Sequence, residues 1–235
     1  MSRGLGDVYK RQMLKKRTGL DNDGLGDIFE LWNRGELNSF LIEITSHILH
    51  YKEENGDYLL DHILDVAGQK GTGKWSVMAA LDEGDPLTLV SEAVFARFMS
   101  ALVSERERAA VQYPSGKVGD MEACIALNSS GIEAVRDALY AAKLISYAQG
   151  FSLMRRASER NGWNLDYGTI AKIWRKGCII RSVFLERITQ AFTKSAGLQN
   201  LLFDAFFHER MENALPALRG VVVAVSYTHL RAHET

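Results

Sequence analysis

Proline and cysteine are both scarce in this chain, which has three prolines and two cysteines in 235 residues. Cys124 and Cys178 lie far apart and outside any metal-ligand spacing, which predicts reduced, structural thiols in a cytoplasmic protein. No apolar run approaches the roughly 20 residues that a membrane span needs. The formal net charge of −1 gives no reason to expect a nucleic acid or an anionic membrane as partner. The composition therefore argues against a membrane-spanning protein and against a nucleic-acid-binding protein, and by itself it names no function.

Helical periodicity dominates the sequence, and we find no convincing alternating strand. Apolar residues recurring at threes and fours predict helices over 27–33, 36–51, 75–81, 87–111, 130–160 and 178–193, and a pair of short helices over 198–218. Gly56, Gly84 and Gly162 mark helix ends, Pro86 suits a first helical position, and Asp166 suits a helix cap. The predicted fold class is all-α.

Two of these segments carry a predicted packing role. In 36–51 the inward face is expected to hold the apolar residues Phe40, Leu41, Ile44, Ile48 and Leu49. In 130–160 the small residues predict a close-packed helix at the centre of a bundle: Ala138, Ala141, Ala142, Ser146, Ala148 and Gly150.

The stretch 65–75 contains the clearest group of residues suited to binding a ligand. Its three glycines let backbone N–H groups approach a ligand, while Lys70, Thr72 and Lys74 add positive charge and a hydroxyl. Thr72 can also cap a helix that begins near Trp75, which we expect to be buried. Freed backbone, cations and a helix N-terminus together predict an anion site, such as one for phosphate.

The same glycines also raise the question of a nucleotide-binding loop. Residues 68–74 match G-x-x-x-x-G-K, but Trp75 stands where the Ser or Thr that holds magnesium is needed. The preceding segment, 58–65, has helical rather than strand spacing. A nucleoside-triphosphatase is therefore not expected. A nucleotide binder that depends on Lys74 is kept as a third hypothesis, which Lys74→Ala would test.

The stretch 63–75 resembles the signature of the decarboxylating 6-phosphogluconate dehydrogenase family. Further stretches resemble that family in the same order: 29–45, 92–97, 139–151 and 173–182. The resemblance covers roughly 13–224 and implies the helical C-terminal domain of an NADP-dependent enzyme of the pentose phosphate pathway, with the Rossmann domain missing.

This resemblance implies a role for three residues. Lys70 and Thr72 of the K-G-T-G-K-W loop and Arg97 of F-A-R match the family's clamp on the phosphate of 6-phosphogluconate. The chemistry fits, because a guanidinium offers paired donors to phosphate oxygens while lysine supplies a point charge. From the residues alone, an Arg97 that reaches solvent or pairs with Glu92 is the favoured interpretation; the resemblance favours ligand contact instead.

Family residues outside this sequence carry the catalysis. The base lysine and acid glutamate belong to a K-x-x-H-N-x-x-x-E-type segment upstream of Met13, so no catalytic residue is assigned here. NADP binds mainly through a G-x-G-x-x-G fingerprint in the missing Rossmann domain. The family's C-terminal tail, which reaches the partner's site in the homodimer, is also missing. We expect this fragment to hold part of the phosphate site and the dimer core, and to be inactive alone.

The two ends, 1–12 and 225–235, lack a sustained period and resemble peptides translated from sequencing-adapter DNA. We expect neither end to pack, which leaves 13–224 as the domain. The alternative to an enzyme fragment is a non-catalytic helical module for binding or dimerisation.

Other polar and aromatic side chains are expected to be structural. His47 and His50 stand three apart, but no third ligand completes a metal site. The basic stretch around Trp174 has too little aromatic interleaving for a nucleic-acid surface. We expect Trp174 in the core, and Arg175 and Arg181 in ion pairs.

Overall fold

The computed structural model describes residues 14–15, 18–64, 66–68, 70–112, 129–175 and 178–227. Over these residues the chain forms helices and no β-strand, with isolated bridges at Ser39–Ser182 and Lys52–Tyr58. The predicted all-α class is confirmed. No described helix is long and apolar enough to cross a bilayer.

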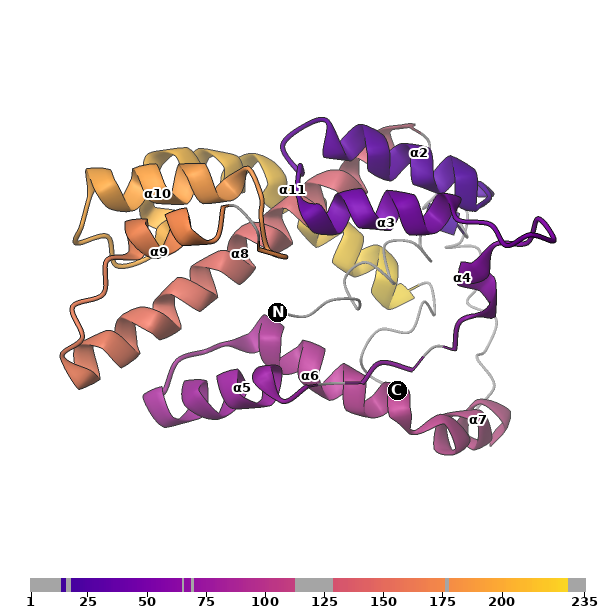
Figure 1. Ribbon diagram of the computed structural model, residues 1–235, viewed down its shortest axis with the longest axis horizontal. Helices are drawn as coiled ribbons and strands as arrows, with labels where there is room; N and C mark the ends of the chain where they lie inside the picture. Colours follow the sequence, from indigo (N-terminus) through magenta and orange to yellow (C-terminus); the bar gives the residue numbers. More distant parts are fainter. Residues whose placement is uncertain are drawn as a thin grey trace.

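The elements in chain order are α2 (Asn22–Asn33), α3 (Phe40–His50), α4 (Leu59–His62), α5 (Thr72–Glu83), α6 (Thr88–Ala101), α7 (Val103–Gln112), α8 (Ser129–Asn161), α9 (Tyr167–Ile173), α10 (Phe184–Lys194), η2 (Leu201–Phe203) and α11 (Ala205–Tyr227). Figure 1 shows α8 running diagonally through the molecule, with α9 and α10 above its lower end, α2 and α3 at its upper end, α11 crossing it, and α5 to α7 below.

The core lies where α8 meets α11 and the two pairs α2–α3 and α9–α10. Val135, Ala141 and Leu144 of α8 have no exposed surface, and Ala138 and Ala148 are also buried. Burying a side chain such as Leu144 stabilises the fold by about 2 kcal/mol. The small residues of α8 thus admit close neighbours, as predicted, although Ser146 is exposed and Gly150 faces open space.

The prediction for α3 is correct in type and only partly correct in orientation, since Leu49 is buried as predicted but Ile44 and Ile48 are not. The helix begins at Phe40 rather than at 36 and buries Ile42, Ser46 and Leu49. The predicted inward residues Ile44 and Ile48 are 37% and 43% exposed. The reason lies in α2, because the Ser46 hydroxyl donates to the Gly26 carbonyl at 3.0 Å and turns that side of α3 inward.

The predicted single helix over 87–111 is two helices. α6 ends at Ala101 and α7 begins at Val103, because Leu102 leaves helical geometry at ψ 51°. The break exposes the Ser100 carbonyl, which accepts a hydrogen bond from Arg106 Nη2 at 3.0 Å. Neither proline nor glycine marks this break in the sequence.

Several helix ends follow local chemistry as predicted. Gly84 and Gly162 end α5 and α8 in the left-handed region, with φ of 62° and 67°. Gly56, at φ 88°, forms the turn after α3. Asp166 caps α9 by accepting the Thr169 N–H at 2.9 Å.

Other boundaries differ from the predictions. α6 starts at Thr88, so Pro86 precedes the first helical position. α10 starts at Phe184, which leaves the 178–183 stretch outside the helix. The predicted pair of short helices over 198–218 is η2 followed by a continuous α11 of 23 residues, in which Val225 is partly buried against the core. Whether the two ends of the sequence come from adapter DNA stays a prediction.

Candidate functional site

The glycine-containing segment connects α4 to α5, and two of its positions, 65 and 69, lie outside the described residues. A helix precedes it, not the strand of a nucleotide-binding loop. The predicted start of the next helix near Trp75 is wrong, because α5 begins at Thr72. Thr72 therefore does not cap the helix. Gly71 takes the N-cap position, and no side chain caps it, so the first N–H groups of α5 are oriented toward the loop.

Two of the three glycines have a physical reason to be glycine. Gly71 adopts φ 91°, which strains any residue with a Cβ. A Cβ at Gly73 would lie 2.8 Å from Val94 Cγ2, so glycine allows α5 to approach α6. Gly68 has neither constraint, since nothing lies within 4 Å of its Cβ position.

Arg97 and the loop are brought together in the structure although they are distant in sequence. Arg97 on α6 donates from Nη1 to the Gly68 carbonyl at 3.1 Å. One residue earlier, the Ala67 N–H donates to Ser100 Oγ at 3.0 Å. The loop backbone is therefore held along one side by α6.

The other residues predicted for the site lie at the surface. Lys70 and Thr72 are exposed, as is Lys74 in the first turn of α5. Trp75 is 67% exposed, so the expectation that it is buried is wrong. Three cationic side chains thus accompany one uncapped helix N-terminus, an arrangement that attracts anions.

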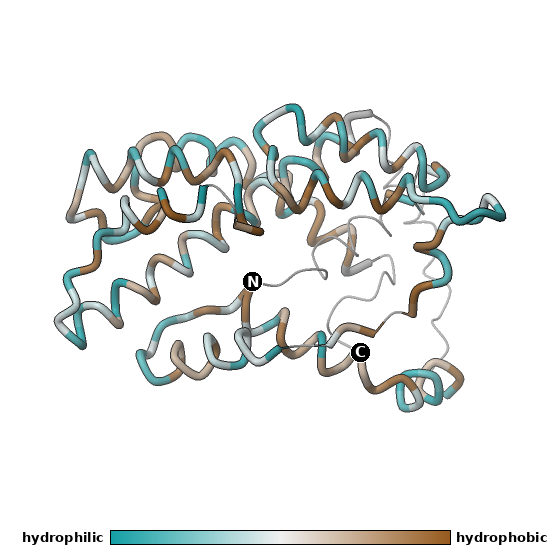
Figure 2. Tube along the Cα trace, viewed as in Figure 1, coloured by the Kyte–Doolittle hydropathy of each residue, from teal (hydrophilic) through white to brown (hydrophobic). Residues whose placement is uncertain are grey.

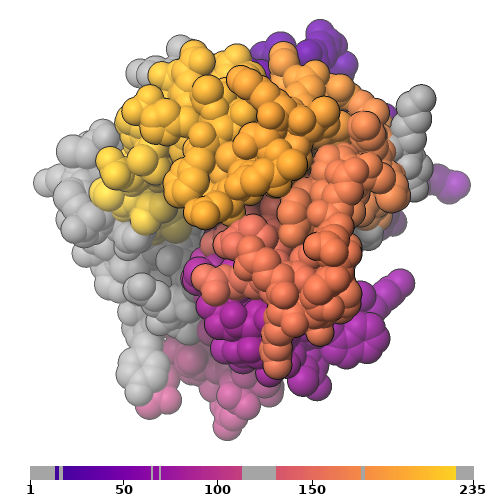
Figure 3. Space-filling view, turned by 90° about the vertical axis from the view of Figure 1, so that its left-hand side faces the viewer, coloured from indigo at the N-terminus to yellow at the C-terminus, as the bar shows by residue number. Residues whose placement is uncertain are grey.

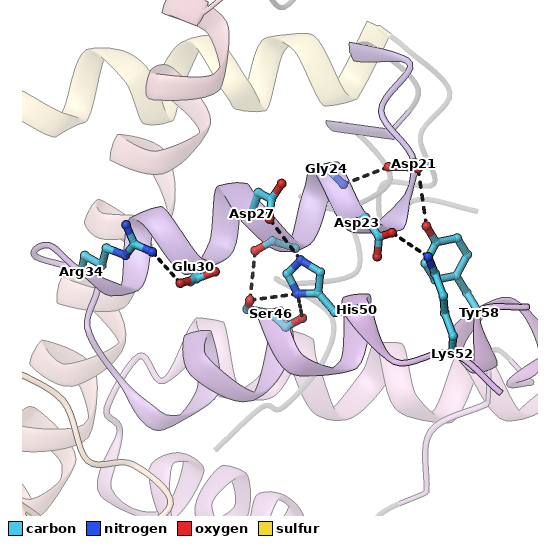
Figure 4. A network of polar contacts seen from close by, with 11 residues as sticks. Asp21, Asp23, Gly24, Asp27, Glu30, Arg34, Ser46, His50, Lys52 and Tyr58 are labelled. Atoms are coloured by element: carbon cyan, nitrogen blue, oxygen red, sulfur yellow. Dashed lines mark hydrogen bonds and ion pairs between the residues drawn. The ribbon is translucent and has the colours of Figure 1, made fainter. Parts of the chain in front are cut away.

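A second polar cluster joins α2 to α3 (Figure 4). His50 contacts Asp27 Oδ1 through Nε2 at 3.2 Å, and its Nδ1 lies 2.9 Å from the Ser46 carbonyl. The Ser46 hydroxyl is buried and donates to the Gly26 carbonyl, so it is not available as a nucleophile. No group of three metal-ligating side chains occurs among the residues described. The cluster joins the two helices.

The ion pair beside this cluster shifts the pKa values of both of its partners. A hydrogen bond from Lys52 to Asp23, at 2.7 Å, lowers the pKa of the Asp23 carboxyl and raises the pKa of the Lys52 amine. Tyr58 donates to Asp21 at 3.4 Å beside them. These contacts attach the 52–58 turn to α2.

The ion pairs expected in the basic stretch are confirmed. Arg175 pairs with Glu186, and Arg181 pairs with Glu43. Trp174 packs partly buried against the core, with its ring centroid 5.8 Å from that of Phe151.

The α5–α6 hairpin carries the candidate site and is attached to α8 by polar contacts that the sequence did not reveal. Asp85, between the two helices, is buried and accepts from Ser152 Oγ at 2.7 Å and from Arg156 Nε at 2.9 Å. Gln149 accepts the Leu89 N–H at 3.1 Å one turn away. Figure 3 shows this end of the molecule, where α8 contacts the hairpin below it.

Fold and loop together define a class: an all-helical domain that presents a cationic, glycine-containing loop beside a helix N-terminus. Comparison with known proteins makes the class specific. Residues 5–232 match the family described as "6-phosphogluconate dehydrogenase, C-terminal domain". The chain belongs to this family.

Curated relatives and a solved structure agree with the family match. The chain is 49% identical over 210 residues to the decarboxylating 6-phosphogluconate dehydrogenase of Mus musculus, and 48% identical over 210 residues to that of Homo sapiens. Each alignment covers 89% of this chain and 43% of the relative. A structure of Plasmodium falciparum 6-phosphogluconate dehydrogenase superposes with a TM-score of 0.87 at 36% identity, covering 96% of this chain and 49% of that one. The chain thus spans less than half the length of these relatives.

Proposed function

We propose that the loop before α5, together with Arg97, forms a subsite for the phosphate of 6-phosphogluconate, with Lys70, Thr72 and Arg97 as its binding residues. The contact of Arg97 with the Gly68 carbonyl carries the proposal, because it places the guanidinium against the loop that bears Lys70. A guanidinium presents its five N–H donors in a planar fork, which matches the geometry of phosphate oxygens. The N-terminus of α5 adds backbone donors on the same side.

The parent of this chain is, in the same proposal, an enzyme that oxidises and decarboxylates 6-phosphogluconate to ribulose 5-phosphate and CO2. The Plasmodium relative binds NADP+ and 6-phosphogluconate. The described helices carry no dinucleotide fingerprint, so we assign NADP mainly to a Rossmann domain outside this chain. The base and the acid of the reaction are assigned to the same missing part, and the chain by itself is expected to be inactive.

A homodimeric, cytoplasmic parent belongs to the same proposal. The support for a dimer in this chain is apolar surface outside the core, part of it on α6, where Figure 2 marks apolar residues along the backbone. Phe95 and Phe98 of α6 are 59% and 43% exposed, and Ile44 and Ile48 of α3 are also exposed. Such surface is typical of an interface, and it equally fits the alternative of a non-catalytic helical module. Sedimentation of the chain separates a dimer from a monomer.

The test of this function uses the complete reading frame. Resequencing the source DNA across both ends should recover an upstream Rossmann domain, and the complete protein should reduce NADP when given 6-phosphogluconate. Arg97→Ala removes charge-assisted bonds and should raise KM about tenfold or more. Lys74→Ala, in the adjacent first turn of α5, serves as the matched control and should change KM less than Lys70→Ala. Turnover of 6-phosphogluconate by the present 235-residue chain alone would contradict the assignment of catalysis to the missing part.

A further inference from the structure

We propose that Ser100 is a positioning residue of the phosphate subsite: its hydroxyl fixes the backbone of the loop that presents Lys70. The inference rests on the proposed function and adds a residue that touches no ligand. It concerns a single side chain on α6, 33 positions after the loop residue that it binds.

Both hydrogen-bonding directions of the Ser100 hydroxyl are used. Its Oγ donates to the Arg97 carbonyl at 2.8 Å, one turn back along α6. Because this bond fixes the hydroxyl hydrogen, an oxygen lone pair is left to accept the Ala67 N–H at 3.0 Å. The hydroxyl therefore has a fixed orientation and serves one loop amide.

The backbone around Ser100 is itself anchored. α6 ends one residue later, and the Ser100 carbonyl accepts from Arg106 Nη2 of α7 at 3.0 Å. The hydroxyl therefore projects from a fixed helix end toward the loop. The hydrogen bond from Ala67 to this hydroxyl therefore fixes the position of Ala67 relative to α6.

The loop itself has little else to hold it by packing. Val66 and Gly68, on either side of Ala67, are both exposed, and nothing lies within 4 Å of the Cβ position of Gly68. Backbone hydrogen bonds attach this stretch to Ser100 and Arg97 of α6. A loop that is ordered before binding loses less conformational entropy when phosphate arrives, which raises its affinity.

Arg97 and Ser100 therefore form two adjacent attachments with different duties. Arg97 binds the Gly68 carbonyl and is itself a proposed phosphate ligand. Ser100 binds the Ala67 amide and lies behind the loop. Loss of the Ser100 hydroxyl should weaken phosphate binding by about fivefold, the equivalent of one net hydrogen bond, without removing any charge from the site.

The experiment compares three serine variants of the 235-residue chain. Affinity for inorganic phosphate and for 6-phosphogluconate is measured by NMR titration, and the exchange rate of the Ala67 amide is measured on the same samples. Ser100→Ala should bind both ligands about fivefold more weakly and exchange the Ala67 proton faster. Ser100→Thr keeps the hydroxyl and should restore both values.

Ser91→Ala is the matched control, because the Ser91 hydroxyl donates to the first turn of its own helix, to the Leu87 carbonyl at 2.8 Å. It should change neither affinity nor Ala67 exchange. Wild-type affinity in Ser100→Ala, with Ala67 still protected, would overturn the positioning role. A wild-type chain that binds neither ligand would reject the phosphate subsite itself, and the positioning role with it, which is a different result.

Discussion

The attachment of the α5–α6 hairpin to α8 gives a prediction whose size can be worked out. Asp85 is replaced by alanine. Its carboxylate side chain is 1% exposed and accepts two hydrogen bonds at Oδ2, from Ser152 and from Arg156, whose side chain is 45% exposed. At about 2 kcal/mol for each bond to a charged group, the two contribute about 4 kcal/mol.

This sum has to be reduced by the cost of burying the second carboxylate oxygen. Asp85 Oδ1 is buried and has no hydrogen-bond partner in the described structure. An unsatisfied buried acceptor costs about 2 kcal/mol, so Asp85→Ala should destabilise the hairpin attachment by about 2 kcal/mol. Ser152→Ala removes one of the bonds and leaves the buried Oδ1 in place, so it should cost about as much, about 2 kcal/mol.

The effect should be local, because the hairpin contributes mainly small side chains to the buried interior, such as Ala80, Ala93 and Ala96. Hydrogen exchange measured by mass spectrometry should show α5 and α6 losing protection in Asp85→Ala while α10 and α11 keep theirs. The double variant Asp85→Ala/Ser152→Ala should lose less stability than the sum of the losses in the two single variants, since both changes remove the same hydrogen bond. Unchanged exchange in α5, or an equal rise in every helix, would refute this reasoning.

Two further predictions follow from glycine positions and from a tyrosine. Gly150→Ala should stabilise the chain by about 0.5–1 kcal/mol in urea unfolding, because a Cβ there meets open space inside a helix; Gly26→Ala should lose stability, because its Cβ would lie 2.4 Å from the His50 ring. Burial raises the pKa of Tyr147 to about 12, so its contribution is complete below pH 10 and is lost as pH rises from 10 to 12. Between pH 9.5 and 11.5 the free energy of unfolding of the wild type should therefore fall by about 2 kcal/mol more than that of Tyr147→Phe. The control Tyr51→Phe, at an exposed tyrosine, should follow the wild type. Parallel curves of stability against pH for the wild type and Tyr147→Phe would contradict this.

Local chemistry predicted several helix ends at which a single residue decides the backbone. Gly84 and Gly162 end helices in the left-handed region, and Asp166 accepts an amide of the helix that follows it. The period of 130–160 predicted α8 nearly to the residue, because a long helix repeats its pattern many times.

Tertiary contacts decided what the sequence could not predict. The apolar stripe containing Ile44 and Ile48 suggested the inward face of α3, but α2 packs on the side of Ser46 instead. The break at Leu102 has no local signal and is accompanied by the bond from Arg106 to Ser100.

In the candidate site, too, the sequence predicted some of the residues, whereas only the fold shows their contacts. Its loop residues stood out by composition, and the family resemblance proposed Arg97 as their partner. Only the fold shows how Arg97 and Ser100 meet Gly68 and Ala67 across about 30 positions, or that Asp85 anchors the hairpin through residues of α8. These pairings join segments with no shared sequence period, so periodicity contains no information about them.

The most direct test of the phosphate subsite is a titration of this chain with 6-phosphogluconate and, separately, with gluconate, followed by the backbone amide signals of the loop and α5. We expect shifts at Lys70 and Thr72 with 6-phosphogluconate and none with gluconate, and weaker binding in Lys70→Ala and Arg97→Ala than in Lys74→Ala. Equal responses to the two sugars, or shifts confined to helices away from this loop, would contradict it.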